Sequence, residues 1–408
     1  MLQLGIINFT KGAYITVEGK AEADKFYIIQ QGKVRIRKET EIVAEEGGNL
    51  LGPGDFIGVV SCLSGHSQIE TAIAETNVTI ITVRKDQYPS LIKDNTPVAM
   101  KIILLFSRRM RYLDEALARI ALKKTAENDS SHIFNVGEFY VRQGKYNIAM
   151  YAYYQYLKAN PGGRFARRAK ERFLMLRKTA KPVYLEPGTS EMSRFYPRDM
   201  MIFSEAQPGS ELYIIQKGQV KISKVVDNNE VLLAVLNPGD IFGEMALLEN
   251  KPRSASAIAY EDCTILVVNR ANFEQMVHSQ PQLISRLTVT LSDRIWLMYK
   301  QLANTLISDI QGKMYDMMCL QLEKNRIPFN NNSYIFPFGP RELATMCGIP
   351  TEKQEEAVRT LLQNKKIQLN EKKLQVSSTA ELLSQATFYK KKQMIESSRL
   401  AGRKTITW

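Results

Sequence analysis

The sequence predicts a multidomain α+β protein built around two small antiparallel β-barrels of the jelly-roll type. Three observations predict this fold class: a length of 408 residues, an internal repeat, and helical segments that do not belong to the repeat. A chain of this length exceeds one ordinary hydrophobic core. We expect barrels with flanking helices, a helical hairpin between them, and a winged helix near the C-terminus. The expected boundaries are 1–125, 126–182, 183–304, 305–378 and 379–408.

The two barrels are predicted by sequence segments that recur after about 185 residues. Each copy consists of short β-rich runs separated by Gly, Pro, Asn or Asp, which is typical of a small antiparallel barrel. Each copy ends in a predicted long helix. The repeated pairs are FYIIQQGKV at 26–34 with LYIIQKGQV at 212–220, and PGDFIGVVSCL at 53–63 with PGDIFGEMALL at 238–248.

Composition favours some functions and excludes others. The 55 basic and 42 acidic residues give a formal net charge of +13, which favours a polyanionic partner such as nucleic acid. A soluble basic protein without such a partner is the alternative. Four scattered cysteines and three histidines argue against a metal site or disulfides. Without a nucleophile–base pair or P-loop, we expect no enzyme.

The start of the chain and its hydropathy bear on location. No apolar run approaches the ~18 residues that span a bilayer, and MLQLGIINFTKGAY lacks the order of a signal peptide. We therefore expect a cytoplasmic protein without membrane association.

Residues 131–180, between the barrels, predict paired amphipathic helices. Small residues at Gly137 and Ala149 would allow the helices to approach, and Pro161 would end the second helix. With Tyr140 and Tyr153, these spacings resemble one tetratricopeptide repeat. A single repeat needs a neighbouring domain for stability. It is either a helical connector or a site for a protein partner. A run of basic residues here is read as a solvated helix face: Arg164, Arg167, Arg168, Lys170 and Arg172.

Residues 239–257, GDIFGEMALLENKPRSASA, supply what a cyclic phosphodiester requires, and we call them the second cassette. A guanidinium pairs with the phosphate, backbone amides surround it, and a carboxylate accepts from a ribose hydroxyl. Gly243 allows a close backbone approach, after which Glu244, Met245 and Ala246 open a short helix. Arg253 follows ten residues after Gly243.

This stretch resembles the phosphate-binding cassette of the cyclic-nucleotide-binding domain, the fold of the bacterial catabolite activator and of kinase regulatory subunits. The resemblance implies that Arg253 pairs with the cyclic phosphate and that Glu244 accepts from the ribose. It also implies that Ser254 and nearby amides complete the phosphate site. The alternative is an empty cassette in which Glu244 and Arg253 pair with each other.

Residues 54–72, GDFIGVVSCLSGHSQIETA, form the first cassette and lack this chemistry. Val59 stands in the place of Glu244, and Gln68 stands in the place of Arg253. Losing charge-assisted pairs costs about 1.5–3 kcal/mol each. We expect the first barrel to be a structural or regulatory domain without a ligand.

The identity of the base depends on the predicted helix at 271–304. Its sequence resembles the dimerising helix of the catabolite activator, so a homodimer is expected. The positions that read adenine in that family are Met298 and Tyr299 here. Tyr299 is predicted to stack on the base, or else to lie in the dimer interface. Ser254 favours cyclic AMP by resemblance; cyclic GMP and a cyclic dinucleotide remain alternatives, and no metal is expected.

The segment 305–378 predicts one helix, followed by a helix–Gly turn–helix unit and then a short pair of strands. It resembles the winged helix-turn-helix of the catabolite-activator family, with 351–363 as recognition helix. Thr351 and Glu356 stand where arginines are usual, and this leaves an acidic helix whose alternative role is protein contact. The predicted DNA-binding residues are Arg341, Thr351, Glu352, Lys353, Glu356 and Arg359.

Together these features predict a transcription regulator that responds to a cyclic nucleotide and binds DNA. The alternative is a signalling adaptor that binds a cyclic nucleotide and regulates a protein partner without binding DNA.

Overall fold

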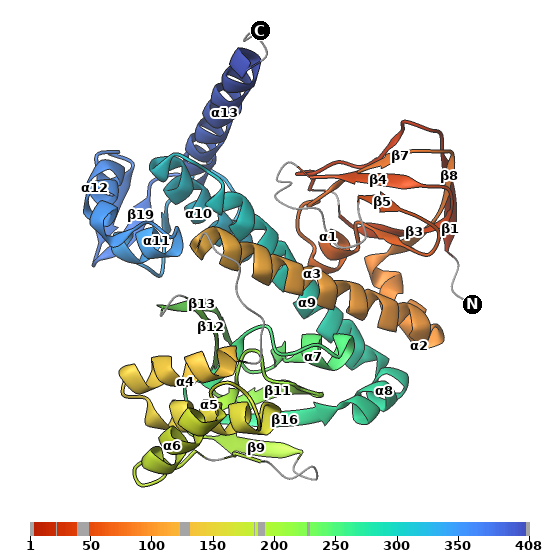
Figure 1. The fold of residues 1–408 in the computed structure, drawn as a ribbon. Helices are drawn as coiled ribbons and strands as arrows, with labels where there is room; N and C mark the ends of the chain where they lie inside the picture. The colour runs from red at the N-terminus through yellow and green to blue at the C-terminus, as the bar shows by residue number, and fades with distance from the viewer. Residues whose placement is uncertain are drawn as a thin grey trace.

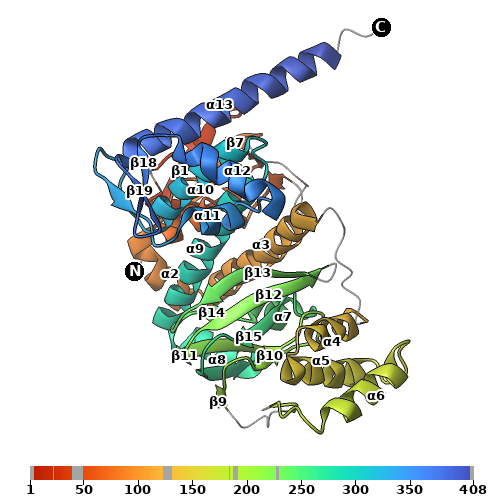
Figure 2. The same ribbon diagram turned by 90° about the vertical axis from the view of Figure 1, so that its left-hand side faces the viewer.

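The computed structural model describes residues 4–21, 23–38, 49–122, 131–182, 184–186, 192–226 and 229–404. Two β-rich domains lie on either side of two long helices, α3 (Thr96–Leu122) and α9 (Pro281–Thr305) (Figure 1). The last helix projects away from the body of the molecule (Figure 2).

The first barrel consists of two four-stranded antiparallel sheets. Alternate residues of each strand point inward, and they bury a cluster that includes Ile29, Val34, Ile57 and Ile80. The helices of this domain are α1 (Val59–Ser64), a 3-10 turn η1 (Lys85–Gln87), α2 (Tyr88–Asp94) and α3. The strands, in spatial order, are β1 (Gly5–Phe9), β8 (Val78–Arg84), β3 (Lys25–Gln31) and β6 (Phe56–Ile57), then β2 (Tyr14–Thr16), β7 (Thr71–Ala74), β4 (Val34–Arg37) and β5 (Leu50–Leu51).

The second barrel repeats this strand order, which confirms the predicted duplication. Its core includes Ile215, Val220, Phe242 and Ile265. Its helices are α7 (Glu244–Glu249), α8 (Arg270–Ser279) and α9. Its strands are β9 (Ser193–Tyr196), β16 (Cys263–Asn269), β11 (Glu211–Lys217) and β14 (Ile241–Phe242), then β10 (Met201–Phe203), β15 (Ser256–Ala259), β12 (Val220–Val226) and β13 (Asn229–Leu236).

The predicted helix at 271–304 is two helices in the structure. The helix α8 ends at Ser279, and α9 begins at Pro281. Proline has no backbone N–H and disfavours helical geometry in the residue before it. Gln280 accordingly adopts φ −133° and ψ 63°, so the chain changes direction there.

Three helices, not the predicted pair, connect the barrels: α4 (His132–Arg142), α5 (Tyr146–Ala159) and α6 (Ala166–Leu176). A Cβ added to Gly137 would lie 2.7 Å from Tyr153 Cε1, so this glycine permits the expected close approach of α4 and α5. The helices pack on the second barrel in one apolar cluster that includes Met201 and Ile258. This confirms the expected packing on a neighbouring domain.

The C-terminal part contains a helix, two short helices joined by a turn, and a small antiparallel sheet. Leu343, Ala344, Ala357 and Leu361 are buried there, while Val358 is half-buried. The elements are α10 (Ile310–Lys324), β17 (Tyr334–Ile335), α11 (Pro340–Met346), α12 (Thr351–Leu362), β18 (Ile367–Asn370), β19 (Lys373–Val376) and α13 (Thr379–Lys404).

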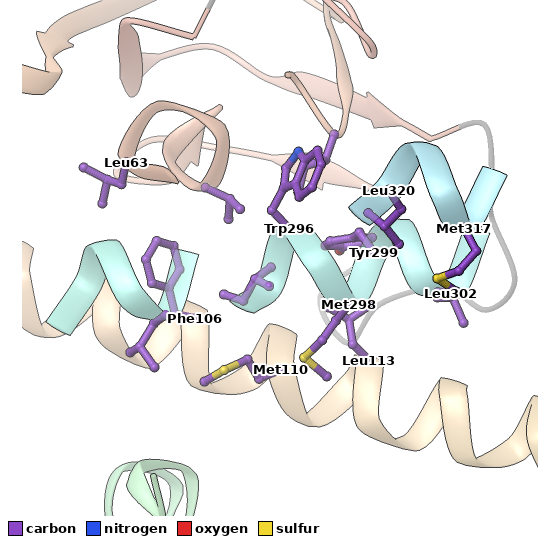
Figure 3. Packing of buried hydrophobic residues seen from close by; sticks show 14 of the residues in the cluster. Leu63, Phe106, Met110, Leu113, Trp296, Met298, Tyr299, Leu302, Met317 and Leu320 are labelled. Atoms are coloured by element: carbon purple, nitrogen blue, oxygen red, sulfur yellow. The ribbon is translucent and has the colours of Figure 1, made fainter. Parts of the chain in front are cut away.

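The helices α3 and α9 pack side by side between the barrels. Figure 3 shows Met110 and Leu113 of α3 beside Met298 of α9, with Trp296 facing the first barrel. The helix α9 also packs on α1, and α3 also packs on α7. The apolar face of α9 was predicted to pair with a second chain, but the structure places it against α3 and α1 of the same chain.

Among the helices that the structure describes, none combines the length and apolar character needed to cross a membrane.

Candidate functional site

Within the second cassette, β14 ends at Phe242 and Gly243 follows it. This residue has φ +78° and caps the N-terminus of α7. A Cβ at this position would lie 2.7 Å from Arg253 Nη1 and 3.0 Å from Tyr213 Cδ2. Only glycine combines this left-handed backbone with so close an approach. The same conformation recurs at Gly58 in the first cassette, where φ is +69°.

A cavity opens between the second cassette, the barrel, α9 and α3. Its empty volume is about 350 Å³, including the open mouth. Apolar side chains form its walls, and four charged residues reach it, from α3, α7, the loop after α7 and α9. The lining residues are Asp114, Phe203, Ile222, Phe242, Gly243, Glu244, Met245, Ala246, Arg253, Ser254, Ala255 and Arg294.

Arg253 is held in place inside this cavity. Only 5% of the residue is exposed, and Nη1 donates a hydrogen bond to the Gly243 carbonyl oxygen at 2.6 Å. The guanidinium carbon lies 4.3 Å from the centre of the Phe203 ring, where the cation gains from the ring's negative face. A guanidinium positioned in this way suits a bound anion.

Glu244 is almost fully buried, with 1% of its surface exposed. Neither carboxylate oxygen has a hydrogen-bond partner on another residue, so Glu244 and Arg253 share the cavity without pairing. The alternative of an internally paired cassette is therefore wrong. Burial raises the pKa of the Glu244 carboxyl, and the nearby Arg294 opposes this rise. A buried, unpaired carboxylate is costly unless a ligand supplies a donor.

Asp114 also lines the cavity, although it belongs to α3 of the first domain. Only 3% of Asp114 is exposed, and Ser254 Oγ donates to its Oδ2 at 3.4 Å. Burial raises the pKa of this carboxyl, with Arg294 and Lys224 opposing the rise.

Contacts between α3 and the second cassette fix the position of Asp114. Arg111 Nε lies 2.9 Å from Glu249 Oε2, and the pair is nearly buried. Ser107 Oγ donates to Glu249 Oε1 at 2.8 Å, and Arg111 Nη1 donates to the Pro252 carbonyl oxygen at 3.2 Å. One face of α3 thus forms a wall of a site in the other domain.

Sequence reasoning missed both Asp114 and Arg294. For Arg294 the signal was present, since it lies in the DRI stretch that matches the activator helix. For Asp114 the signal is weaker. Aligning Pro97 with Pro281 places Asp114 opposite Met298, at the expected base-reading position of the other copy.

Tyr299 does not line the cavity. Its hydroxyl accepts a hydrogen bond from Lys38 Nζ at 2.6 Å, on the side of α9 that faces the first barrel. The physical reason is helical phase: five residues after Arg294, the side chain points about 140° away from it. The structure therefore does not bring Tyr299 to the base. The other predicted residues, Gly243 to Ala246, Arg253 and Ser254, do come together.

The first cassette is closed by side chains of the protein itself. Val59 and Gln68 are buried, and Gln68 Oε1 would lie 3.2 Å from a Cβ at Gly58, much as Arg253 approaches Gly243. The Glu70 carboxylate pairs with Arg109 at 3.2 Å in an environment with almost no exposure. This charge pair and the apolar Val59 leave the first cassette without an available cation or ribose acceptor.

The helix α9 covers the first cassette. Trp296 Nε1 donates to the Ser67 carbonyl oxygen at 3.1 Å, and its ring stacks on His66 with 4.0 Å between centroids. His66 Nε2 lies 3.3 Å from Asp293 Oδ1.

The predicted DNA-binding residues lie on the exposed faces of α11 and α12. Arg341 is 3.7 Å from Glu355, and the side chains are 81% and 79% exposed. Thr351 begins α12, but its side chain lies outside the described residues. The other members, all exposed, are Glu352, Lys353, Glu356 and Arg359.

Comparisons with known proteins identify the type of the two barrel domains. Residues 6–95 and 193–280 each match the cyclic nucleotide-binding domain. A CRP-like cAMP-activated global transcriptional regulator of Mycobacterium tuberculosis is 30% identical over 120 residues, which cover 29% of this chain and 54% of the regulator. The match thus spans about half of that relative. The cyclic AMP receptor protein of Thermus thermophilus is 26% identical over 203 residues, covering 48% of this chain and 88% of the relative.

Among solved structures, the Thermus thermophilus catabolite activator protein is 25% identical and has a TM-score of 0.28. The alignment covers 51% of this chain and 100% of that one. The strand order, the two matches and the relatives lead to one conclusion: residues 6–95 and 193–280 of this chain are two cyclic nucleotide-binding domains, and its relatives include CRP-like regulators.

Proposed function

We propose that the chain is a cytoplasmic transcription regulator that binds a cyclic nucleotide in its second barrel and DNA through its C-terminal elements. One observation carries the ligand assignment: the buried Glu244 carboxylate has no partner and shares a cavity with Arg253. A cyclic nucleotide offers a ribose hydroxyl to the first and a phosphate to the second.

Cyclic AMP is the proposed ligand. Both relatives described above carry cyclic AMP in their names, and Ser254 agrees with this ligand by resemblance. Cyclic GMP and cyclic di-GMP are the competing ligands, and each is included in the test.

Calorimetric titration of the full chain tests the ligand and the site together. Arg253→Ala should weaken cyclic AMP binding by at least about tenfold, because a charge-assisted hydrogen bond contributes roughly 1.5–3 kcal/mol. The matched control is Gln68→Ala, at the same position of the first cassette, which should bind as wild type does. Binding that survives Arg253→Ala but is lost in Gln68→Ala would mean that the ligand binds in the first barrel and not in the second.

The route from ligand to output runs through α9 in this proposal. Arg294 lines the cavity at the middle of α9, and the same helix contacts α10 near its end. Asn304 Nδ2 donates to Asp316 Oδ2 at 2.9 Å, and Lys300 lies 3.5 Å from Glu323. A ligand that contacts Arg294 differently in two conformations would shift their populations and move the C-terminal elements.

For DNA binding, we assign α11 and α12 to a helix-turn-helix and β18–β19 to its wing. Exposed lysines flank α12 and the wing at Lys365, Lys366, Lys372 and Lys373, where they would contact phosphates. The logarithm of the affinity for random duplex DNA should then fall with log salt by ~0.9 for each phosphate neutralised. Lys372→Ala/Lys373→Ala should lower that slope. An absence of salt-dependent binding, with and without ligand, would reject this assignment.

A signalling adaptor that controls a protein partner is the second candidate. It is favoured by the exposed carboxylates Glu352, Glu355 and Glu356 on α12, which repel phosphates. This candidate predicts ligand binding without any affinity for duplex DNA, so the salt titration separates the two.

A further inference from the structure

The positive charge of the chain is concentrated in the helices that connect the barrels. Residues 131–180 contain ten Lys and Arg residues against two Glu residues, a net charge of +8, whereas the whole chain has +13. The C-terminal unit at 305–378 is close to neutral, with ten Lys and Arg residues against eight Asp and Glu residues. A local surplus of this kind attracts a surface of opposite charge.

On α6 the surplus forms one exposed stripe, which we call the basic stripe. Arg167, Lys170 and Arg177 are exposed and follow one another at intervals of three and seven residues, which places them on one side of a helix. Arg177 continues the helical backbone beyond the end of α6, with φ −56° and ψ −21°. Leu174 lies within the stripe and is 50% exposed. Arg167 lies 3.8 Å from Glu171, and no other described carboxylate forms an ion pair with this stripe.

The opposite charge is exposed on α12, in a stripe that we call the acidic stripe. Glu352, Glu355 and Glu356 are spaced three and four residues apart, so they lie on one side of the helix. Glu355 lies 3.7 Å from Arg341 in a largely exposed pair, which is therefore weak. No other described cation forms an ion pair with this stripe. Like charges at this spacing destabilise a helix, so a basic partner would stabilise α12.

The two stripes are placed so that two copies of the chain can pair them reciprocally. Figure 1 shows α6 and α12 at the same side of the molecule, on separate domains, and Figure 2 shows that side facing the viewer. A twofold axis uses every contact twice, because the same surface is present on both copies. An axis that passes between α6 and α12 therefore places each basic stripe on the acidic stripe of the second copy.

We infer that two copies of this chain form a dimer in which α6 of each copy packs on α12 of the other. The charges of the two stripes are complementary, and Leu174 adds apolar area that becomes buried. Each helix also carries one charge of the opposite sign beside its stripe, Glu171 on α6 and Arg359 on α12, and these two form a further pair. Exposed ion pairs are individually weak and are screened by salt, so the dimer should be reversible and sensitive to salt.

This dimer covers α12, the helix that we assign to DNA recognition. Duplex DNA and the second copy then compete for one surface, so the dimer is the form that does not bind DNA. The inference goes beyond the proposed function, because it requires no bound cyclic nucleotide and holds whether or not the C-terminal unit binds DNA.

Sedimentation velocity of the full chain over a range of concentrations tests the dimer. We expect a monomer–dimer equilibrium that weakens by at least about tenfold between about 0.05 M and about 0.5 M NaCl. Lys170→Glu/Arg177→Glu makes the basic stripe acidic, and Glu352→Lys/Glu356→Lys makes the acidic stripe basic. Each variant alone should dimerise at least about tenfold more weakly than wild type, because like charges then face each other. An equimolar mixture of the two variants should form dimers again, since every contact regains opposite charges.

The recovery in the mixture distinguishes the interface from a loss of structure, which mixing would not repair. The matched control is Lys20→Glu/Lys25→Glu, which reverses two exposed lysines of the first barrel and should dimerise as wild type does. A chain that stays monomeric at low salt overturns the inference, and so does a dimer that neither reversal weakens, or a mixture that does not recover. If the basic stripe of a monomeric chain binds random duplex DNA, its partner is nucleic acid and not a second copy. Cyclic AMP titration of the same variants tests the proposed function separately.

Discussion

At the scale of single residues, the buried Glu244 carboxylate lowers the stability of the ligand-free protein. Burial raises the pKa of its carboxyl, so the folded state holds a proton at pH values where the unfolded chain has released it. The contribution of Glu244 to stability is therefore most favourable below the carboxyl's ordinary pKa of 4.5 and declines as pH rises through the raised value. At neutral pH the ligand-free site is destabilised, and a ligand that donates to Glu244 offsets this.

Glu244→Gln should separate stability from binding. A neutral amide is easier to bury than a carboxylate, so the ligand-free variant should gain about 0.5–2 kcal/mol of unfolding free energy at neutral pH. Urea denaturation at pH 5 and pH 8 measures this, with a smaller gain expected at pH 5. Cyclic AMP affinity should fall. A variant no more stable than wild type at pH 8 would contradict the account of Glu244.

The residues of one cassette were predictable, and those from elsewhere were not. Gly243, Glu244 and Arg253 lie within eleven consecutive positions, so local spacing determines that they meet. Asp114 reaches the same cavity from more than a hundred residues earlier in the chain, and no local pattern encodes that approach. The prediction that Tyr299 contacts the ligand was wrong, because packing between the domains determines which face of α9 turns to the cavity.

At the scale of elements, Gly137 determines how closely α4 and α5 pack. Gly137→Ala should destabilise the protein by about 1–3 kcal/mol through overpacking against Tyr153, although alanine is the better helix former. The control is Gly162→Ala, because a Cβ at Gly162 meets nothing within 4 Å; that variant should stay within ~0.5 kcal/mol of wild type. Chemical denaturation measures both. If Gly137→Ala is as stable as wild type, the close approach is not a constraint.

Element boundaries followed the strongest local signals. The chain breaks at Pro281 and again around Pro161 to Gly163, where α5 ends and α6 follows. At Pro281 the hydrophobic pattern continues across the break, so the sequence predicted one helix where the structure has two. At Pro161 the predicted end of the helix is confirmed. The repeat predicted that the two barrels are copies of one domain, and their shared strand order confirms this.

At the scale of the whole molecule, each long helix covers the cassette of the other domain. The helix α3 packs on α7, where Arg111 binds Glu249, and α9 packs on α1. Asp114 accepts from Ser254 in the second cassette, and Trp296 donates to Ser67 in the first. An arrangement expected between two chains is thus present within one. Tertiary packing alone determines that each long helix covers the cassette of the other domain in the same chain. The sequence of α9 therefore indicated an interface with a second chain.

This crossed packing of α3 and α9 also explains why the first cassette is closed and the second one has a cavity. The first cassette is closed by its own Glu70–Arg109 pair and by Trp296, while the second retains a cavity that α3 completes. We therefore expect one ligand per chain.

Native mass spectrometry of the full chain, titrated with cyclic AMP, tests this most directly. The account predicts one bound nucleotide per chain at saturation, and at least about tenfold weaker binding in Arg253→Ala. Two nucleotides per chain, or one that Arg253→Ala binds as tightly as wild type does, would contradict it.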